Sequence, residues 1–128
     1  MSEKDKQILK EITMKGEIWR QSSLAPAYYV SNYGRIYGTL YHRLIQPETS
    51  QHGYARIFIK DLATNRFKHY FVHTLIATEF CAGKSEGAEV HHKNRNKLDN
   101  RASNLMWVTK PVHEYIHSLL DKLGGAAA

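Results

Sequence analysis

The histidines in the last third of the chain are the side chains best suited to chemistry. Four of the eight histidines lie between Val90 and His117, as the adjacent pair His91 and His92 and as the pair His113 and His117. A neutral imidazole can bind a transition metal, and its ordinary pKa of about 6.5 lets it accept a proton at physiological pH. This segment therefore has the side chains for a metal site and for acid–base catalysis.

The spacing of these histidines predicts a division of roles. His113 and His117 are four residues apart, so they share one face of a helix. Side chains alternate along a strand, so His91 and His92 point to opposite faces. We expect His91, His113 and His117 to bind one metal ion that keeps an open position for water or a phosphate oxygen. His92 is then the candidate general base. His117 has a second interpretation, as an ordinary cation in the latter half of the helix.

Asn104 is the candidate partner of the base. Its amide cannot accept a proton, but it can form a hydrogen bond with a ring nitrogen of His92 and so fix the orientation and tautomer of that ring. The alternative interpretation is a turn residue ahead of a strand.

Cations are interleaved with the histidines in the same segment. We expect them to contact phosphates, which positions a duplex without reading its sequence. A solvated loop is the alternative. The expected contacts are Lys93, Arg95, Lys97 and Arg101.

The pattern around the histidines predicts two strands and a helix that position them. Val90–His92 and Leu105–Thr109 are short apolar strands, separated by a polar loop over residues 93–103. A helix follows from about Lys110, with Pro111 in its first turn, where proline is tolerated. A hairpin backed by a helix can bring all four histidines together.

Upstream of this region, β-type patterns predominate from residue 17 to about residue 61. The cluster Ser31–Gly34 predicts a hairpin turn, in which Gly34 supplies a positive φ. Arg35 and Tyr33 have two interpretations, as a hairpin tip that rests on DNA or as plain turn residues. The fold class is predicted to be α+β. Expected strands cover residues 28–30, 35–37, 54–60 and 69–72, and expected helices cover residues 4–14 and 73–80.

Composition narrows the class of protein. Eighteen Lys and Arg against twelve Asp and Glu give a net charge of +6, which favours a polyanionic partner. The single cysteine, Cys81, excludes an intrachain disulfide and a cysteine-based zinc site. Residues 1–15 have no apolar core of signal-peptide length, and no stretch approaches a transmembrane span. We therefore expect an intracellular protein that is neither secreted nor bound to a membrane.

Three motifs resemble the HNH, or His-Me finger (ββα-metal), endonucleases of the phage and intron homing type. The C-terminal motif consists of His92, the run Asn104-Leu105-Met106-Trp107-Val108-Thr109, and His113. Asp99-Asn100-Arg101 is similar to the turn of that family, and Val72-His73-Thr74-Leu75-Ile76-Ala77-Thr78-Glu79-Phe80 is similar to its upstream helix. The N-terminal runs Glu17-Ile18-Trp19 and Tyr29-Val30-Ser31-Asn32-Tyr33-Gly34-Arg35-Ile36 resemble a NUMOD-type module.

The resemblance implies roles for individual residues. It implies that His92 is the general base, that Asn104 orients it, and that His113 and His91 bind the metal. Many homing members have Asp or Asn in place of His91 and Asn in place of His113, so this site looks more like the all-histidine centres of the colicin nucleases. The family resemblance implies Mg²⁺ or Mn²⁺, whereas imidazole ligands also suit Zn²⁺ or Ni²⁺.

The sequence thus predicts four segments and one activity. The segments are an N-terminal extension (1–16), a NUMOD-type β-rich DNA-contacting module (17–66), an HNH ββα-metal nuclease domain (67–121) and a flexible tail (122–128). The predicted activity is metal-dependent hydrolysis of phosphodiester bonds in double-stranded DNA, by a monomer that nicks or a homodimer that cuts both strands. The alternatives are a non-catalytic DNA-binding protein with a structural histidine–zinc site, and an RNase of the same fold.

Overall fold

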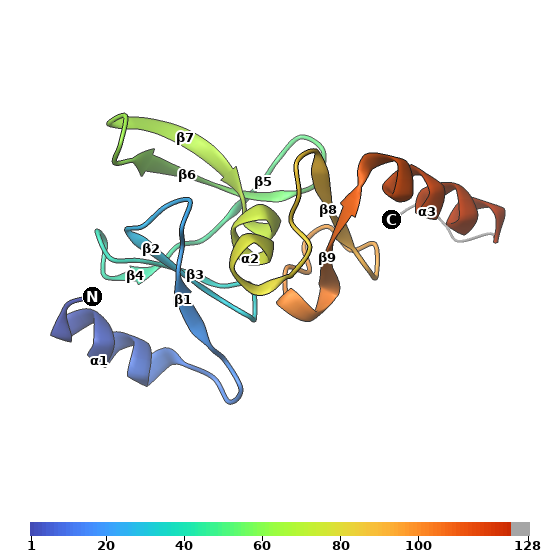
Figure 1. Cartoon of the computed structure of the whole chain (residues 1–128). Helices are drawn as coiled ribbons and strands as arrows, with labels where there is room; N and C mark the ends of the chain where they lie inside the picture. Colours follow the sequence, from blue (N-terminus) through green and yellow to red (C-terminus); the bar gives the residue numbers. More distant parts are fainter. Residues whose placement is uncertain (124–128) are drawn as a thin grey trace.

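The computed structural model describes residues 1–123 as an α+β fold, which confirms the predicted class (Figure 1). The predicted flexible tail falls outside the described residues except for its first two positions. The elements are α1 (Glu3–Ile12), β1 (Trp19–Gln21), β2 (Tyr28–Ser31), β3 (Ile36–Gly38), β4 (Arg43–Leu44), β5 (Glu48–Thr49), β6 (Ala55–Asp61), β7 (Arg66–Phe71), α2 (Val72–Phe80), β8 (Ala88–His92), the 3₁₀ turn η1 (Ala102–Asn104), β9 (Leu105–Thr109) and α3 (Lys110–Lys122).

Three small antiparallel sheets make up the β structure. The first has the order β1-β2-β3-β4, the second β5-β6-β7, and the third is the β8-β9 hairpin. In that hairpin His91 pairs with Met106 and His92 pairs with Leu105. The hairpin and α3 form the predicted strand–loop–strand–helix unit.

The central helix α2 joins the three sheets into one core. Leu75, Ile76 and Ala77 of α2 are fully buried, and they belong to one apolar cluster with residues of every sheet. Figure 1 shows α2 in the middle of the molecule with the sheets around it. The members from the sheets include Tyr28, Val30, Ile36, Ile57, Ile59 and Leu105.

The β6–β7 hairpin is longer than the sequence predicts. Asn65 has φ 59°, and this left-handed turn residue lets β7 begin at Arg66 rather than at His69. All six residues of β7 then pair with β6. The predicted boundary between the N-terminal module and the nuclease domain, between residues 66 and 67, therefore falls inside β7, whose residues all pair with β6.

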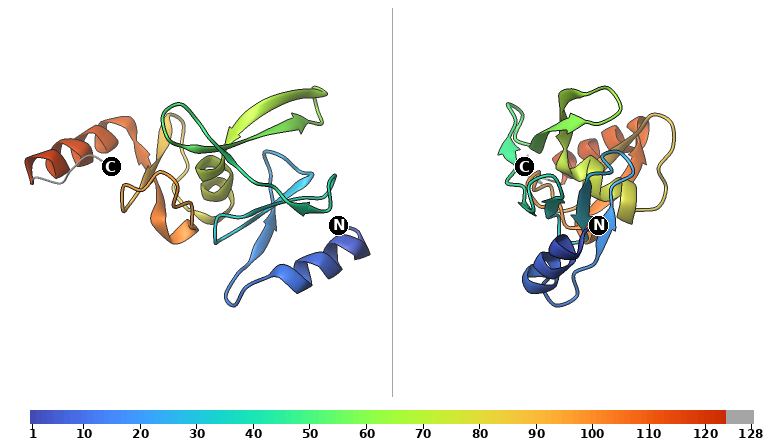
Figure 2. Two further views of the ribbon diagram at one scale, coloured as in Figure 1. Left: turned by 180° about the vertical axis from the view of Figure 1, so that it is seen from behind. Right: turned by 90° about the vertical axis from the view of Figure 1, so that its left-hand side faces the viewer.

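Helices α1 and α3 lie at opposite ends of the molecule (Figure 2). Ser2 caps α1, and the buried carboxylate of Asp5 accepts a hydrogen bond of 2.5 Å from the Tyr37 hydroxyl of β3. Helix α3 carries Pro111 in its first turn, as predicted, and contains no fully buried residue. Within residues 1–123, no helix combines the length and the apolar character that crossing a bilayer requires.

Candidate metal centre and active site

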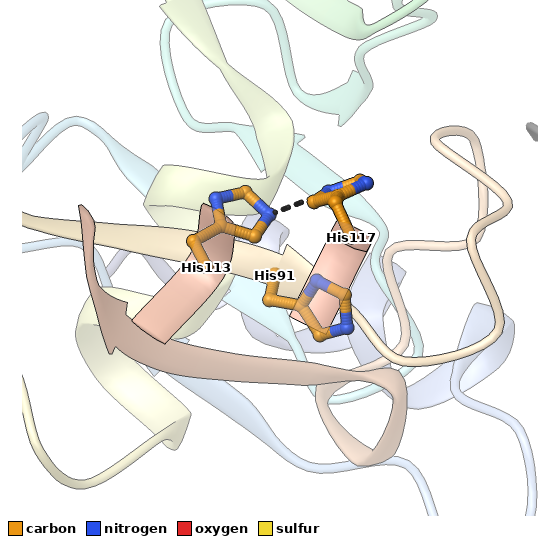
Figure 3. Close-up of side chains that lie close together, drawn as sticks. All are labelled: His91, His113 and His117. Carbon is orange, nitrogen blue, oxygen red and sulfur yellow. Dashed lines mark hydrogen bonds between the residues drawn. The ribbon is translucent and has the colours of Figure 1, made fainter. Parts of the chain in front are cut away.

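Three imidazoles converge where β8 meets α3. His91 comes from β8, and His113 and His117 come from successive turns of α3 (Figure 3). One ring nitrogen of each residue lies within 4.8 Å of those of the other two. The His113 and His117 Nε2 atoms are 3.1 Å apart. The predicted clustering is confirmed, and three nitrogen donors suit a borderline transition metal.

His92 has different neighbours from His91, as expected for adjacent strand positions. The centroid of its ring lies 5.1 Å from that of His73 and 6.0 Å from that of Tyr54. His91 instead faces His113 and His117. Both His91 and His92 still line the same small pocket at the end of β8. A candidate base therefore lies beside a candidate metal site without being part of it.

The prediction that Asn104 forms a hydrogen bond with His92 is wrong. Asn100 forms the hydrogen bond with the His92 ring instead. The Nε2 atom of His92 lies 2.8 Å from the Oδ1 atom of Asn100, and both residues are buried. A carboxamide oxygen only accepts hydrogen bonds, so the proton of neutral His92 is on Nε2 and the lone pair is on Nδ1. Asn100 thus fixes the tautomer that leaves Nδ1 available.

Asn104 holds the loop that carries Asn100. Its Oδ1 atom accepts from the Asn94 backbone N–H at 3.0 Å. Its Nδ2 atom donates to the Asn94 Oδ1 atom at 2.9 Å and to the Asp99 carbonyl at 2.8 Å. The buried Asn104 side chain therefore connects both ends of the loop over residues 94–99. The hydrogen bonds of its side chain go to this loop, and its backbone carbonyl accepts from the Lys93 N–H beside His92.

The turn between β2 and β3 contacts the chain just after this loop, at Asn100 and Ala102. The Asn32 carbonyl accepts from the Ala102 backbone N–H at 2.8 Å. Gly34 has φ 83°, as predicted, and a Cβ atom added there would lie 2.8 Å from the Asn100 carbonyl oxygen. The N-terminal sheet therefore packs directly against the segment that positions the candidate base.

Burial favours the neutral form of both His91 and His92. Burial lowers the pKa of His92 below its ordinary value, and the hydrogen bond to Asn100 acts in the opposite direction. Burial also lowers the pKa of His91, and the neighbouring His113 lowers it further. A neutral imidazole is the form that binds a metal or accepts a proton.

The predicted DNA-contacting cations divide into two groups. Arg95 and Lys97 line the pocket with the four histidines, and the Lys97 ammonium lies 4.9 Å from the centroid of the Tyr54 ring. Lys93 and Arg101 are exposed on the loop outside that pocket. Arg101 binds Asp99 through two hydrogen bonds of 2.9 and 2.7 Å, which lower the pKa of that carboxyl to about 2.

The structure favours a structural role for Arg35 over the expected DNA contact. Its guanidinium forms two hydrogen bonds with the Glu17 carboxylate, one of them 2.8 Å from Nε to Oε2. It also donates to the Ile12 carbonyl at 2.8 Å and stacks over the Trp19 ring. The Glu-x-Trp and Gly-Arg motifs are thus partners within one module.

Sequence reasoning assigned no functional role to three residues of the site. Asn100 contacts the candidate base. Tyr54 precedes β6 and forms one wall of the histidine pocket. Glu89 of β8 contacts His113. Glu89 could have been found from its spacing, because it lies two residues before His91 and shares one face of the strand. Asn100 and Tyr54 have no such spacing, because the loop and the sheet pairing bring them to the histidines.

A β-hairpin closed by a helix, with an imidazole pair on each part, defines a ββα-metal nuclease site. Comparison with known proteins gives the same assignment. A sequence profile described as "HNH endonuclease" matches residues 70–115. The DNA endonuclease I-HmuI of Bacillus phage SP01 is 36% identical over 86 residues, which cover 67% of this chain and 48% of that protein. The H-N-H endonuclease F-TflII of Escherichia phage T5 is 30% identical over 102 residues, 78% of this chain and 52% of that protein.

A solved structure agrees with the sequence matches. The structure that describes DNA binding and cleavage by the HNH homing endonuclease I-HmuI superposes with a TM-score of 0.74 and 29% identity, covering 87% of this chain and 62% of that one. The chain therefore belongs to the HNH endonuclease family. It spans about half the length, or less, of the curated relatives that it matches.

Proposed function

We propose that this protein is a metal-dependent DNA endonuclease of the homing type that hydrolyses phosphodiester bonds. The observation that carries the proposal is the buried, tautomer-fixed His92 beside a cluster of three imidazoles in one cationic pocket. Hydrolysis of a phosphodiester needs an in-line nucleophile and stabilisation of the charge that develops on the phosphate and the leaving oxygen. The pocket holds a candidate base that can activate the nucleophile, and candidate metal ligands and cations that can stabilise the developing charge.

His92 is the proposed general base. Its Nε2–H donates to Asn100, so Nδ1 can take a proton from an attacking water molecule. The pKa lowered by burial keeps Nδ1 unprotonated at neutral pH. Asn100 is the positioning residue for this step, and Asn104 maintains the loop on which Asn100 lies.

His91, His113 and His117 are the proposed metal ligands. Their ring nitrogens lie close enough together for one divalent ion. When held by these residues, a divalent ion would supply charge neutralisation at the phosphate and at the leaving 3′ oxygen. The three nitrogen donors favour Zn²⁺ or Ni²⁺ over Mg²⁺.

Lys97 and Arg95 are the proposed phosphate contacts nearest to the reaction. Lys97 is held by the Tyr54 ring and by a 3.1 Å hydrogen bond to the His52 carbonyl, so its charge is fixed at the rim of the pocket. Lys93 is proposed to contact the backbone further along the duplex. The NUMOD-type module is proposed to contact DNA as well as to brace the catalytic loop. Such a protein acts inside a bacterial or phage-infected cell, where its substrate is found.

Incubation with supercoiled plasmid tests this function. The metal-free protein is mixed with plasmid and with Mg²⁺, Mn²⁺, Zn²⁺ or Ni²⁺ in turn, with a chelator as the control. Conversion of supercoiled DNA to the open-circular form indicates nicking, and direct conversion to the linear form indicates cleavage of both strands. A matched RNA duplex tests the RNase alternative. No cleavage under any metal would contradict the proposal.

A further inference from the structure

We infer that Glu89 is a positioning residue for His113. By accepting a hydrogen bond from the His113 Nδ1 atom, it leaves the His113 Nε2 atom free to bind the metal. The inference rests on the proposed function, because it concerns the metal site of the nuclease. The His113 Nδ1 atom lies 2.8 Å from the Glu89 Oε2 atom. The His113 side chain is 20% exposed and that of Glu89 is 45% exposed, so the pair lies at the rim of the pocket.

The position of Glu89 follows from the alternation of β8. Glu89 and His91 are two residues apart, so they project from the same face of the strand. Both meet α3, where Glu89 contacts His113 and His91 faces His113 and His117. One face of β8 therefore supplies both a candidate ligand and the carboxylate that orients another. The opposite face supplies His92.

The contact decides which nitrogen of His113 carries the proton. An ionised carboxylate only accepts hydrogen bonds, so the Nδ1 atom of neutral His113 must donate to Glu89. The lone pair is then on Nε2. That atom faces the His117 Nε2 atom at 3.1 Å and so points into the cluster. The tautomer required for metal binding is thus present before any ion arrives.

His113 needs such a partner because its helix is weakly packed. Helix α3 has no fully buried residue, so core packing does not lock its side chains. A hydrogen bond from the second ring nitrogen fixes the ring about its side-chain torsions and raises its basicity as a ligand.

Metal binding by matched variants of the full chain tests the inference. The wild type, Glu89→Ala, Glu89→Gln and Glu86→Ala are freed of metal, and Zn²⁺ is titrated into each while heat is measured. Glu86 is an exposed carboxylate three residues away, and its replacement removes the same charge without touching His113. Thermal unfolding in chelator checks that each variant is folded.

We expect Glu89→Ala to weaken Zn²⁺ binding by about 10- to 100-fold. Glu89→Gln should lie between Glu89→Ala and the wild type, because its amide oxygen still accepts but has no charge. Glu86→Ala should bind as the wild type does. In the metal-free protein, long-range ¹H–¹⁵N spectra should place the His113 proton on Nδ1 in the wild type and shift it towards Nε2 in Glu89→Ala.

Two results separate this inference from the proposed function. If the wild type binds Zn²⁺ and Glu89→Ala binds it equally tightly, with the same His113 tautomer, the role of Glu89 is wrong and the nuclease proposal stands. If the wild type binds no divalent ion, the metal-dependent function fails and the role of Glu89 fails with it.

Discussion

The Nε2 atom of His92 lies 2.8 Å from the Oδ1 atom of Asn100, and this contact connects the proposed base to the loop between β8 and β9. His92 is the last residue of β8. The loop that leaves β8 turns back within eight residues and places an amide beside the ring. The orientation of the base therefore depends on how this loop is held.

Replacing Asn100 tests that dependence. Asn100→Ala removes the acceptor that selects the Nε2–H tautomer, so part of the His92 population presents a protonated Nδ1 to water. We expect the single-turnover rate of plasmid cleavage to fall at least about tenfold, and by less than the roughly 10²–10⁴-fold that a general base contributes. Zn²⁺ affinity should be unchanged, because Asn100 does not contact the three-imidazole cluster. An unchanged cleavage rate would show that Asn100 does not position His92 for catalysis.

Gly34 offers a test of the support from the N-terminal sheet. Alanine at this position is strained at φ 83°, and its Cβ atom would lie 2.8 Å from the Asn100 carbonyl oxygen. We expect Gly34→Ala to lower the free energy of unfolding by about 1–3 kcal/mol in denaturant titrations and to slow plasmid cleavage.

Gly87→Ala is the matched control for this prediction. Gly87 has φ 76°, but a Cβ atom added there meets nothing within 4 Å. The Gly87→Ala variant should have a lower free energy of unfolding because of the backbone strain at φ 76° alone, and it should cleave plasmid at the wild-type rate. If the two variants cleave DNA equally well, the turn does not support the catalytic loop.

Sequence reasoning predicted the periodic elements well and the loop contacts poorly. The strand Leu105–Thr109 has the predicted bounds, and α2 begins one residue earlier than expected. Strand and helix periodicity also placed His91 near His113 and His117. The position of Asn100 follows instead from the three hydrogen bonds of Asn104 and from the packing of Gly34, which is 66 positions away from Asn100 in the sequence. No local pattern records such contacts.

Chelation distinguishes a catalytic metal site from a structural zinc site. None of the three clustered imidazoles belongs to the apolar core around α2, and α3 extends away from that core. We expect a chelator to abolish plasmid cleavage and to leave the far-ultraviolet circular dichroism spectrum of the protein unchanged at 25 °C. A protein held together by structural zinc would unfold instead. Loss of the folded spectrum in chelator would favour the non-catalytic alternative.

His73 should make stability depend on pH. Burial and, to a smaller extent, the neighbouring His92 together lower its pKa from 6.5 to about 4. The pKa in the folded state is then below that in the unfolded state, so between these values the unfolded chain binds more protons. The free energy of unfolding should therefore fall as the pH drops from 7 towards 4, by up to about 3 kcal/mol from this group.

The variant His73→Phe checks this prediction, because phenylalanine can still stack on Phe71 and does not titrate. Urea titrations at pH 7 and pH 5 should show a smaller loss of stability in this variant than in the wild type. His69→Phe, at an exposed position of β7, is the control and should retain the full loss. Equal pH dependence of His73→Phe and the wild type would exclude His73 as the cause.

The most direct test of the central claim is the rate at which His92→Ala cleaves supercoiled plasmid under the metal that best supports the wild type. Zn²⁺ affinity and thermal unfolding are measured on the same preparation. We predict a rate roughly 10²–10⁴-fold below that of the wild type, with metal affinity and unfolding temperature preserved. Equal rates for His92→Ala and the wild type would contradict the assignment of His92 as the general base.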